Sequence, residues 1–237
     1  MTTSALKRRW PLLAGLFLLC AGIGLVGSVI WQNFLPDAAA EQAAAVAAAD
    51  LHHEWAADTA SSDTGTPSLQ DNPMNRPIGK GFAILYIPRL GDRWRSVVVE
   101  GVQDADLLGK VGHFKASAEP GMIGNFALAA HRLTKGSLFR YLDEVKPGDF
   151  VIVETRTHWY VYTITGSDII SPTDIAVTLP VPFKPGKTPT RAIITLTTCH
   201  PWYSSTSRLA VSGVLTETRL KSMGPPAALP AEAVTTP

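Results

Sequence analysis

Hydrophobic residues are spread very unevenly along this chain of 237 residues. From Pro11 to Ile30 no residue is charged, and Leu, Gly, Ala, Val and Ile dominate. A helix of about 20 such residues matches the hydrocarbon thickness of a bilayer. Trp10 and Trp31 stand at the two ends of this run, where aromatic side chains collect at membrane interfaces. The pattern predicts a transmembrane anchor over residues 10–31.

The residues that flank the run indicate its orientation. Three basic residues precede it at positions 7–9. Because basic residues stay on the cytoplasmic side, we expect residues 1–9 in the cytoplasm and the rest of the chain outside it, at the cell membrane. A cleaved signal peptide with a small-residue site at 38–40 is the alternative, but the apolar run is longer than the roughly 7–15 residues of a signal sequence. We favour the uncleaved anchor.

Polar residues become more frequent after the run, and residues 32–77 are interpreted as a spacer. The stretch 38–57 is rich in alanine, which has the highest helix propensity, but it carries no strong apolar stripe. We therefore expect a solvent-facing helix there, followed over 61–75 by a flexible linker rich in Ser, Thr, Asp, Pro and Gly. The adjacent histidines His52 and His53 are expected to be solvated rather than to bind metal.

Between residues 78 and 218 the apolar runs become short, rich in Val, Ile and Thr, and separated by turn signals such as Pro120-Gly121. This pattern predicts a mostly β domain, a closed or nearly closed barrel with short helices in loops near 105–108 and 138–145. The expected strands are Phe82–Ile87, Ser96–Glu100, Asn125–Ala130, Asp149–Glu154, His158–Ile164, Ile193–Thr198 and Leu209–Thr216.

Charge and composition add two expectations. The formal net charge is +1, which gives no reason to expect nucleic acid as a partner. Residues 219–237 are rich in Pro and Ala and show no apolar pattern, so they are predicted to form a disordered tail.

The two cysteines say more about the function of the chain than its charge does. Cys20 lies within the apolar run, which leaves Cys199 as the only thiol of the exported domain, without a partner for a disulfide. An inert cysteine packed as a small hydrophobic residue and a reactive cysteine are both compatible with this count. The position of Cys199 in its strand distinguishes the inert from the reactive cysteine.

Side-chain alternation favours the reactive cysteine. In the segment 193–199 the thiol of Cys199 ends the hydroxyl-bearing face, opposite the bulky aliphatic residues. His131 likewise ends the strand 125–130 on its small-residue face, and Arg208 starts the last strand in phase with small residues. All three residues stand at strand ends on uncluttered faces, where a substrate can reach them.

These three residue types suit nucleophilic catalysis. A thiol is a strong nucleophile only as thiolate, a form that a nearby imidazolium or guanidinium favours. His131 can protonate a leaving amine, and Arg208 can donate hydrogen bonds to an oxyanion or to a substrate carbonyl. The pattern therefore predicts acyl transfer with Cys199 as the nucleophile.

The same residues resemble the motifs of a known family. Residues Thr195–Cys199 read Thr-Leu-Thr-Thr-Cys and resemble the TLxTC signature of sortases, and Arg208 follows nine positions later, like the family's catalytic arginine. The segment Asn125–Arg132 looks like the strand that ends in the sortase histidine, which is His131 here. The resemblance covers about Gly79 to Glu217, nearly all of the predicted domain.

This resemblance implies a fold and a reaction. It implies an eight-stranded sortase barrel preceded by a transmembrane helix, and a cysteine transpeptidase that cleaves an LPxTG-like sorting signal of secreted proteins between Thr and Gly. The acyl group passes through a thioester on Cys199 to an amine of peptidoglycan or of its lipid-linked precursor. Residues His131–Thr134 and Cys199–Pro201 look most like class E sortases, which are associated with LAxTG variants.

The resemblance also bears on cofactors and neighbouring residues. We expect no cofactor, and no metal, because no carboxylate cluster like the calcium site of some class A members is visible. His113 is expected to make structural hydrogen bonds and Arg132 to be a solvated charge, while a role for His200 stays open. Three residues are expected to contact substrate: Ala129, Thr197 and Thr198.

Other classes of protein remain possible from the residues alone. An L,D-transpeptidase or a plain cysteine peptidase uses similar residues, but L,D-transpeptidases place their histidine shortly before the cysteine, whereas 68 positions separate His131 from Cys199. An anchored β-barrel binding module with an inert thiol is the third alternative. Such a module would keep its function in the variant Cys199→Ala.

Overall fold

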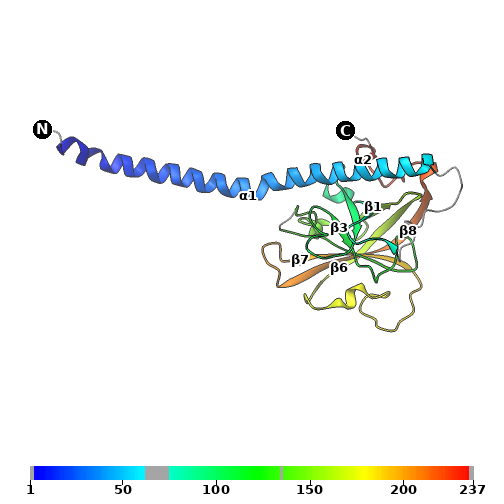
Figure 1. Cartoon of the computed structure of the whole chain (residues 1–237). Coiled ribbons are helices and arrows are strands. Elements are labelled where there is room, and N and C mark those ends of the chain that lie inside the picture. The colour runs from blue at the N-terminus through cyan, green and yellow to red at the C-terminus, as the bar shows by residue number, and fades with distance from the viewer. Residues whose placement is uncertain (1–2, 62–74, 134–135, 235–237) are drawn as a thin grey trace. The chain divides into compact units, whose positions relative to one another are not determined.

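Eight strands close into a barrel in the order β1-β2-β3-β4-β7-β8-β6-β5 (Figure 1). The structure, a computed structural model, describes residues 3–61, 75–133 and 136–234. The predicted closed, mostly β barrel is confirmed, and only β3 was not predicted, because three residues are too few for an alternation pattern. The strands are β1 (Gly81–Tyr86), β2 (Arg95–Glu100), β3 (Val111–His113), β4 (Gly124–Ala129), β5 (Phe150–Glu154), β6 (His158–Ile170), β7 (Ala192–His200) and β8 (Ser207–Leu220).

The connections between strands contain short helical turns. The helix predicted over 138–145 is confirmed in part, as the 3-10 turn η4, whereas residues 105–108 form turns. The Pro120-Gly121 turn signal is also confirmed, since Gly121 has a φ of +79° and a Cβ there would lie 2.1 Å from the ring of Tyr160. The 3-10 turns are η3 (Pro88–Leu90), η4 (Leu142–Glu144), η5 (Ile175–Thr178) and η6 (Lys221–Met223).

The strand directions define two ends of the barrel. β4 and β7 run parallel, and β8 runs antiparallel to both β7 and β6. The last residues of β4 and β7 and the first residues of β8 therefore meet at one end, which we call the β4/β7 end. The hairpin that joins β5 to β6 lies at the other, the β5/β6 end.

The barrel interior is filled by alternate residues of the strands. Phe126 and Leu128 of β4 and Ile194 and Leu196 of β7 are all fully buried in one cluster, as the alternation pattern predicts. A barrel of eight strands is just wide enough for its own side chains. The core therefore fixes the register of β4 and β7, and with it the positions of the residues at their ends.

A helix covers part of the outer barrel surface. The helix α1 (Thr3–Ser61) buries Ala44, Ala48, Leu51 and Trp55, which recur at the spacing of one helix face. The last three pack against outward-facing residues of β1, β2, β5 and β6, and Figure 1 shows this cyan part of α1 beside β1. The helix expected over 38–57 is confirmed, but its expected exposure to solvent is wrong, because alanines allow close approach to an apolar strand face without forming a bulky stripe.

A buried carboxylate strengthens this contact. Glu154 of β5 accepts hydrogen bonds from His52 Nε2 (2.8 Å) and Tyr86 Oη (2.6 Å), and it also pairs with the Lys221 ammonium. Burial acts to raise the pKa of Glu154, but the hydrogen bond and charge of His52 and the charge of Lys221 outweigh it, so the pKa lies below its ordinary value. The expectation that His52 is solvated is thus confirmed only in part, because its side chain is 39% exposed but also bonds to a buried carboxylate.

The C-terminal segment differs from the predicted disordered tail. β8 continues to Leu220, and a short helix, α2 (Ala231–Val234), follows. Leu229 and Ala233 are buried in the cluster that contains Trp55, and Ala233 accepts a hydrogen bond of 2.9 Å from Arg95 Nη1. Two apolar residues four positions apart suffice for this docking, although the Pro- and Ala-rich composition conceals them.

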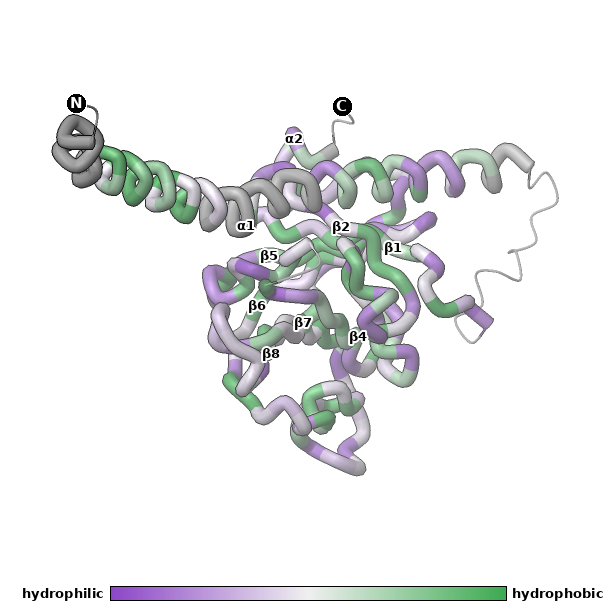
Figure 2. The backbone as a smooth tube through the Cα atoms, turned by 60° about the vertical axis from the view of Figure 1, so that its left-hand side comes forward, coloured by the Kyte–Doolittle hydropathy of each residue, from purple (hydrophilic) through white to green (hydrophobic). Residues whose placement is uncertain are grey.

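The chain divides into two compact units, residues 1–39 and 40–237. In the first unit, large apolar side chains between Leu13 and Val26 are exposed, and Figure 2 colours this stretch of α1 largely as hydrophobic. Among the described residues, no helix is both long and apolar enough to cross a membrane. The anchor over 10–31 stays a prediction, and most of the predicted linker, 62–74, lies outside the described residues.

Candidate active site

Three adjacent strands bring the predicted catalytic residues together at the β4/β7 end. β4 and β7 pair in parallel with Ala129 opposite Thr197, so His131 and Cys199 each lie two residues beyond the same pair. β7 and β8 are antiparallel, with Cys199 directly opposite Arg208. Because neighbouring strands are about 4.8 Å apart, this register sets the three residues side by side, with the cysteine in the middle.

The backbone around His131 is held on both sides. The Phe139 N–H donates a hydrogen bond of 3.1 Å to the His131 carbonyl, and the Ala130 N–H donates one of 3.2 Å to the Thr197 carbonyl. Most of the His131 side chain is buried, and its Nε2 lies 3.8 Å from Oδ1 of Asp104, whose side chain is 80% exposed. That distance is too long for a hydrogen bond, so Asp104 adds a solvent-screened charge.

Cys199 and Arg208 face each other across β7 and β8. Cys199 is a free, half-buried thiol near the end of its strand. Arg208 Nη1 donates to the carbonyls of Ser205, in the connection between the two strands, and of Ser207, the first residue of β8, at 3.0 Å each. Both acceptors are neutral, so these bonds orient the guanidinium without cancelling its charge. The positive charge thus stays next to the strand position of the thiol.

The hydroxyls of the signature strand have a structural role that the sequence did not predict. Thr197 Oγ1 donates to the Leu128 carbonyl (3.1 Å) and Thr198 Oγ1 donates to the Ala130 carbonyl (2.8 Å). Both threonines are buried. These hydroxyls hold β4 against β7, which differs from the substrate contacts expected of them. Ala129 is half-buried, and its contact with substrate stays a prediction.

Sequence reasoning missed Arg132. It was expected to be a solvated charge, but its side chain is 2% exposed, and its Nη1 lies 3.2 Å from both the Cys199 carbonyl and Nδ1 of His200. One signal could have found it. Arg132 follows His131 as His200 follows Cys199, and parallel strands place residues of equal offset side by side.

His113 has the structural role predicted for it. Its Nδ1 lies 3.1 Å from Oε1 of Glu100, and its Nε2 lies 2.9 Å from Oγ of Ser117. Burial acts to raise the pKa of Glu100, but the hydrogen bond from His113 and the charge of Arg76 outweigh it and lower that pKa. His113 therefore belongs to a buried ion-pair group on β2 and β3.

The same group places two carboxylates and an imidazole within ligand distance of one another. One ligand atom from each of Glu100, His113 and Glu119 lies within 4.8 Å of the others, an arrangement that the sequence did not reveal. Arg76 donates to Glu100 (2.9 Å) and, through two nitrogens, to Glu119 (3.2 and 2.9 Å). The guanidinium thus supplies the positive charge that the two carboxylates require.

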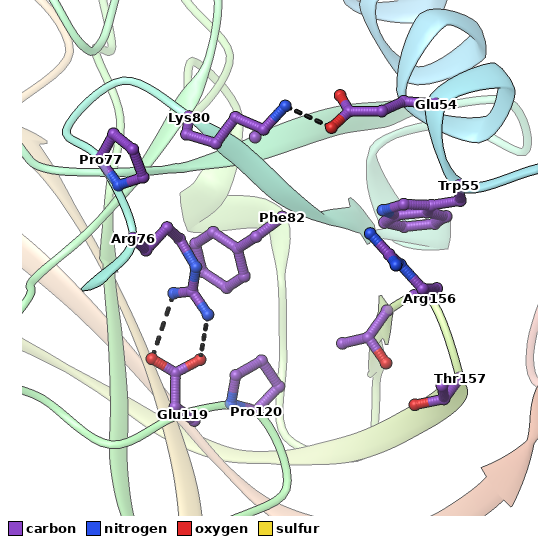
Figure 3. Close-up of a pocket in the computed structure, with 12 residues that line it drawn as sticks. Glu54, Trp55, Arg76, Pro77, Lys80, Phe82, Glu119, Pro120, Arg156 and Thr157 are labelled. Atoms are coloured by element: carbon purple, nitrogen blue, oxygen red, sulfur yellow. Dashed lines mark hydrogen bonds and ion pairs between the residues drawn. The ribbon is translucent and has the colours of Figure 1, made fainter. Parts of the chain in front are cut away.

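A pocket of about 570 Å³ lies at the β5/β6 end, beside this group (Figure 3). Its walls contain the ion pairs Arg76–Glu119 and Lys80–Glu54. His131, Cys199 and Arg208 are not among its lining residues. This pocket is therefore separate from the predicted catalytic residues, which lie at the other end of the barrel.

Comparison with known proteins agrees with this geometry. The family described as the sortase domain matches residues 85–216. Sortase SrtE1 of Streptomyces coelicolor is 36% identical over 210 residues, covering 84% of this chain and 54% of that protein. Sortase SrtE2 of the same organism is 31% identical over 208 residues, covering 84% of this chain and 78% of that protein.

A solved structure agrees as well. The crystal structure of sortase E1 from Streptomyces coelicolor with a tripeptide in the active site superposes with a TM-score of 0.59 at 40% identity, over 64% of this chain and 97% of that one. Fold and site define a closed β-barrel that carries a cysteine, a histidine and an arginine on adjacent strands at one end. The chain belongs to the sortase family. It spans about half the length of the curated SrtE1 relative.

Proposed function

We propose that this chain is a class E-type sortase that cleaves an LAxTG- or LPxTG-like sorting signal between Thr and Gly. The observation that carries the proposal is the register of β4, β7 and β8, in which Cys199 lies between His131 and Arg208. The likeness to sortases of the E group over the barrel supports the class.

Each of the three residues has one task in the proposed reaction. The Cys199 thiolate attacks the carbonyl carbon of the signal's Thr, and Arg208 donates hydrogen bonds to the oxyanion that forms. His131 gives a proton to the nitrogen of the leaving Gly as the C–N bond breaks, which leaves a thioester on Cys199. An acceptor amine then attacks the thioester and loses its proton to His131, so that the thiolate is restored.

The proposed partners follow from this chemistry. The acyl donor is a secreted protein that carries the sorting signal, and the acceptor is an amine of peptidoglycan or its lipid-linked precursor. The tripeptide bound in the active site of the related sortase E1 supports a peptide as the ligand. The exposed aromatic residues Trp202 and Tyr203, in the connection that follows Cys199, offer apolar surface beside it.

We also propose that the first unit anchors the enzyme at the cell membrane, with its N-terminus in the cytoplasm and the barrel outside. The uncharged run Pro11–Ile30 and the basic residues at 7–9 support this orientation. A membrane-anchored barrel would meet secreted proteins at the surface where lipid-linked cell-wall precursors are displayed.

The first prediction concerns the thioester. The full chain incubated with an LAxTG peptide and no amine should gain the mass of the acyl fragment on Cys199, as intact-mass and peptide mapping would detect. Addition of an oligoglycine amine should release the fragment as a new peptide bond. The variant Cys199→Ala should form no adduct and no product.

Two results would contradict the proposed reaction. Product formation by Cys199→Ala would exclude the thiol as nucleophile. An unmodified Cys199 across a broad library of sorting-signal peptides would favour a binding module. Hydrolysis without transfer to any amine would instead identify a plain cysteine peptidase, the class that uses the same residues.

A further inference from the structure

Arg132 is the largest side chain that is fully buried among the described residues. It stands directly after His131, where the sequence predicts a solvated charge. Burying a guanidinium is costly unless its donors are paired, because a charged group loses its hydration in the interior. The contacts of Arg132 therefore indicate what the protein gains from this position.

The guanidinium reaches into two segments. Its Nε donates to the Arg140 carbonyl (3.1 Å), and Nη2 pairs with Asp143 Oδ1 at 2.6 Å, both in the connection between β4 and β5. Its Nη1 donates to the Cys199 carbonyl (3.2 Å) and contacts Nδ1 of His200 (3.2 Å) at the end of β7. A single planar group thus ties the segment that carries the histidine to the residue that carries the thiol.

The contact with His200 fixes the state of that ring. An arginine side chain only donates hydrogen bonds, so Nδ1 of His200 accepts this one and carries no proton. His200 is paired with Ser207 across β7 and β8, next to the pair of Cys199 and Arg208. The contact leaves Nδ1 occupied, which assigns His200 to the support of the strand end rather than to proton transfer.

The charge of Arg132 is also poorly cancelled. The guanidinium is 1% exposed, whereas the side chain of its carboxylate partner Asp143 is 52% exposed and therefore screened by water. The Arg140 and Cys199 carbonyls, which accept the bonds from Nε and Nη1, are neutral. A positive charge is thus buried against the backbone of Cys199.

We propose that Arg132 is a positioning residue of the transpeptidase site, which holds the Cys199 peptide and the His200 ring and so fixes the Cys199 thiol beside His131. The inference rests on the proposed function, since it concerns the same nucleophile. Arg132 acts through Cys199 from the opposite side of the extended chain, because successive residues alternate in direction. It therefore differs from Arg208, which faces the substrate side.

The test compares Arg132→Met with Arg132→Lys in the full chain. Methionine removes both the fork of donors and the charge, so kcat with the LAxTG peptide should fall by about 30- to 100-fold while KM changes by less than about threefold. Lysine restores the charge but not the fork that reaches two acceptors, so kcat should remain at least about tenfold low. Each rate is divided by the concentration of folded protein, which circular dichroism measures.

A second readout does not depend on transpeptidation. The rate of Cys199 alkylation by iodoacetamide at pH 7, mapped by mass spectrometry, should fall about 3- to 10-fold in Arg132→Met and stay low in Arg132→Lys. Neither side chain bonds to both acceptors, so the Cys199 peptide is no longer held and the thiol leaves its position beside His131 and Arg208. The alkylation rate therefore tests the role of Arg132 separately from the proposed transpeptidase function. If the chain transfers no acyl group at all, the proposed function fails while the change in alkylation still tests Arg132.

The matched control is Arg76→Met, which removes another buried arginine with carboxylate partners, on the β2/β3 group. It should lower the melting temperature but leave kcat and alkylation within about twofold of wild type. Equal losses of kcat in Arg76→Met and Arg132→Met would overturn the proposal. Full recovery of kcat in Arg132→Lys would also overturn it, since a point charge would then suffice.

Discussion

Cys199 has one neighbouring strand on each side, and each strand supplies one of its two proposed catalytic partners. Thr197 and Thr198 precede it with similarly small side chains, yet their hydroxyls are committed to backbone carbonyls of β4 and its extension. Cys199 comes two residues after Thr197, the last residue of β7 that pairs with β4. At the scale of single residues, position along one strand therefore separates structural hydroxyls from the proposed nucleophile.

The prediction at this scale concerns Arg208. The variant Arg208→Ala should lower kcat by about 100- to 1000-fold, the usual loss when an oxyanion donor is removed. Steady-state kinetics with the LAxTG peptide measure this loss. Arg219→Ala is the matched control, because Arg219 lies on the same strand at the β5/β6 end and bonds to the carbonyls of Met223 and Gly224. Similar losses of kcat in the two variants would contradict a role for Arg208 in the oxyanion site.

Secondary-structure elements from distant parts of the chain meet at Glu154. It receives hydrogen bonds from α1 and β1 and pairs with the lysine of η6. The carboxylate therefore joins the helix, the barrel and the C-terminal segment in one buried network. Such networks are costly to break, because one missing partner leaves the others buried and unpaired.

The prediction at the scale of elements is a pH-dependent stability. The pKa of Glu154 is lower in the folded protein than in the unfolded chain, so its contribution is present above the unfolded pKa of about 4.3 and is lost as pH falls through the folded pKa. Glu154→Gln should lower the free energy of unfolding by about 1–3 kcal/mol at pH 7. It should also flatten the fall in stability below pH 5.

Urea unfolding at pH 7 and at several lower pH values measures both effects. Glu217→Gln on β8 is the control, since Glu217 has an exposed ion pair of 3.6 Å with Arg219. Loss of this ion pair should lower the free energy of unfolding by less than about 1 kcal/mol. If Glu154→Gln leaves the protein as stable as wild type at pH 7, the network contributes nothing and the prediction is wrong.

The whole molecule consists of two units that meet within one helix, α1. The barrel, its core and the covering part of α1 all lie in residues 40–237. The apolar run lies almost entirely in the first unit. The boundary thus separates the residues that stabilise the barrel from those proposed to anchor it.

The prediction at this scale uses two truncations. Removal of residues 1–39 should move the protein from the membrane fraction to the soluble fraction while thioester formation and melting temperature stay as in the full chain. Removal of residues 1–61 should also lose at least about 3 kcal/mol of stability, because four buried side chains of α1 are removed from the barrel. Fractionation, mass spectrometry and urea unfolding measure these outcomes.

Either of two results would contradict this division. A chain without residues 1–39 that remains in the membrane fraction would place the anchor elsewhere. Equal stability of the two truncated chains would show that the α1 contact contributes nothing to the barrel.

Sequence pattern alone determined seven of the eight strands, the candidate reactive residue types and the strand ends at which they stand. Alternation in 193–199 and 125–131 predicted the core face and the open face, since each strand signals its own burial with a period of two. The family signature added the pairing of Cys199 with His131 and Arg208. These inferences rest on neighbours along the chain, which a sequence displays directly.

Only the tertiary structure decided what lies across the strands and over the barrel. No local pattern predicts the burial of Arg132 and Leu229 or the bond between His52 and Glu154, because the partners are distant in sequence or on other elements. The burial of Arg132 depends on two carbonyls and a carboxylate that folding brings within bonding distance of its guanidinium. Single residues thus showed the chemistry of this protein, and long-range contacts decided what holds that chemistry in place.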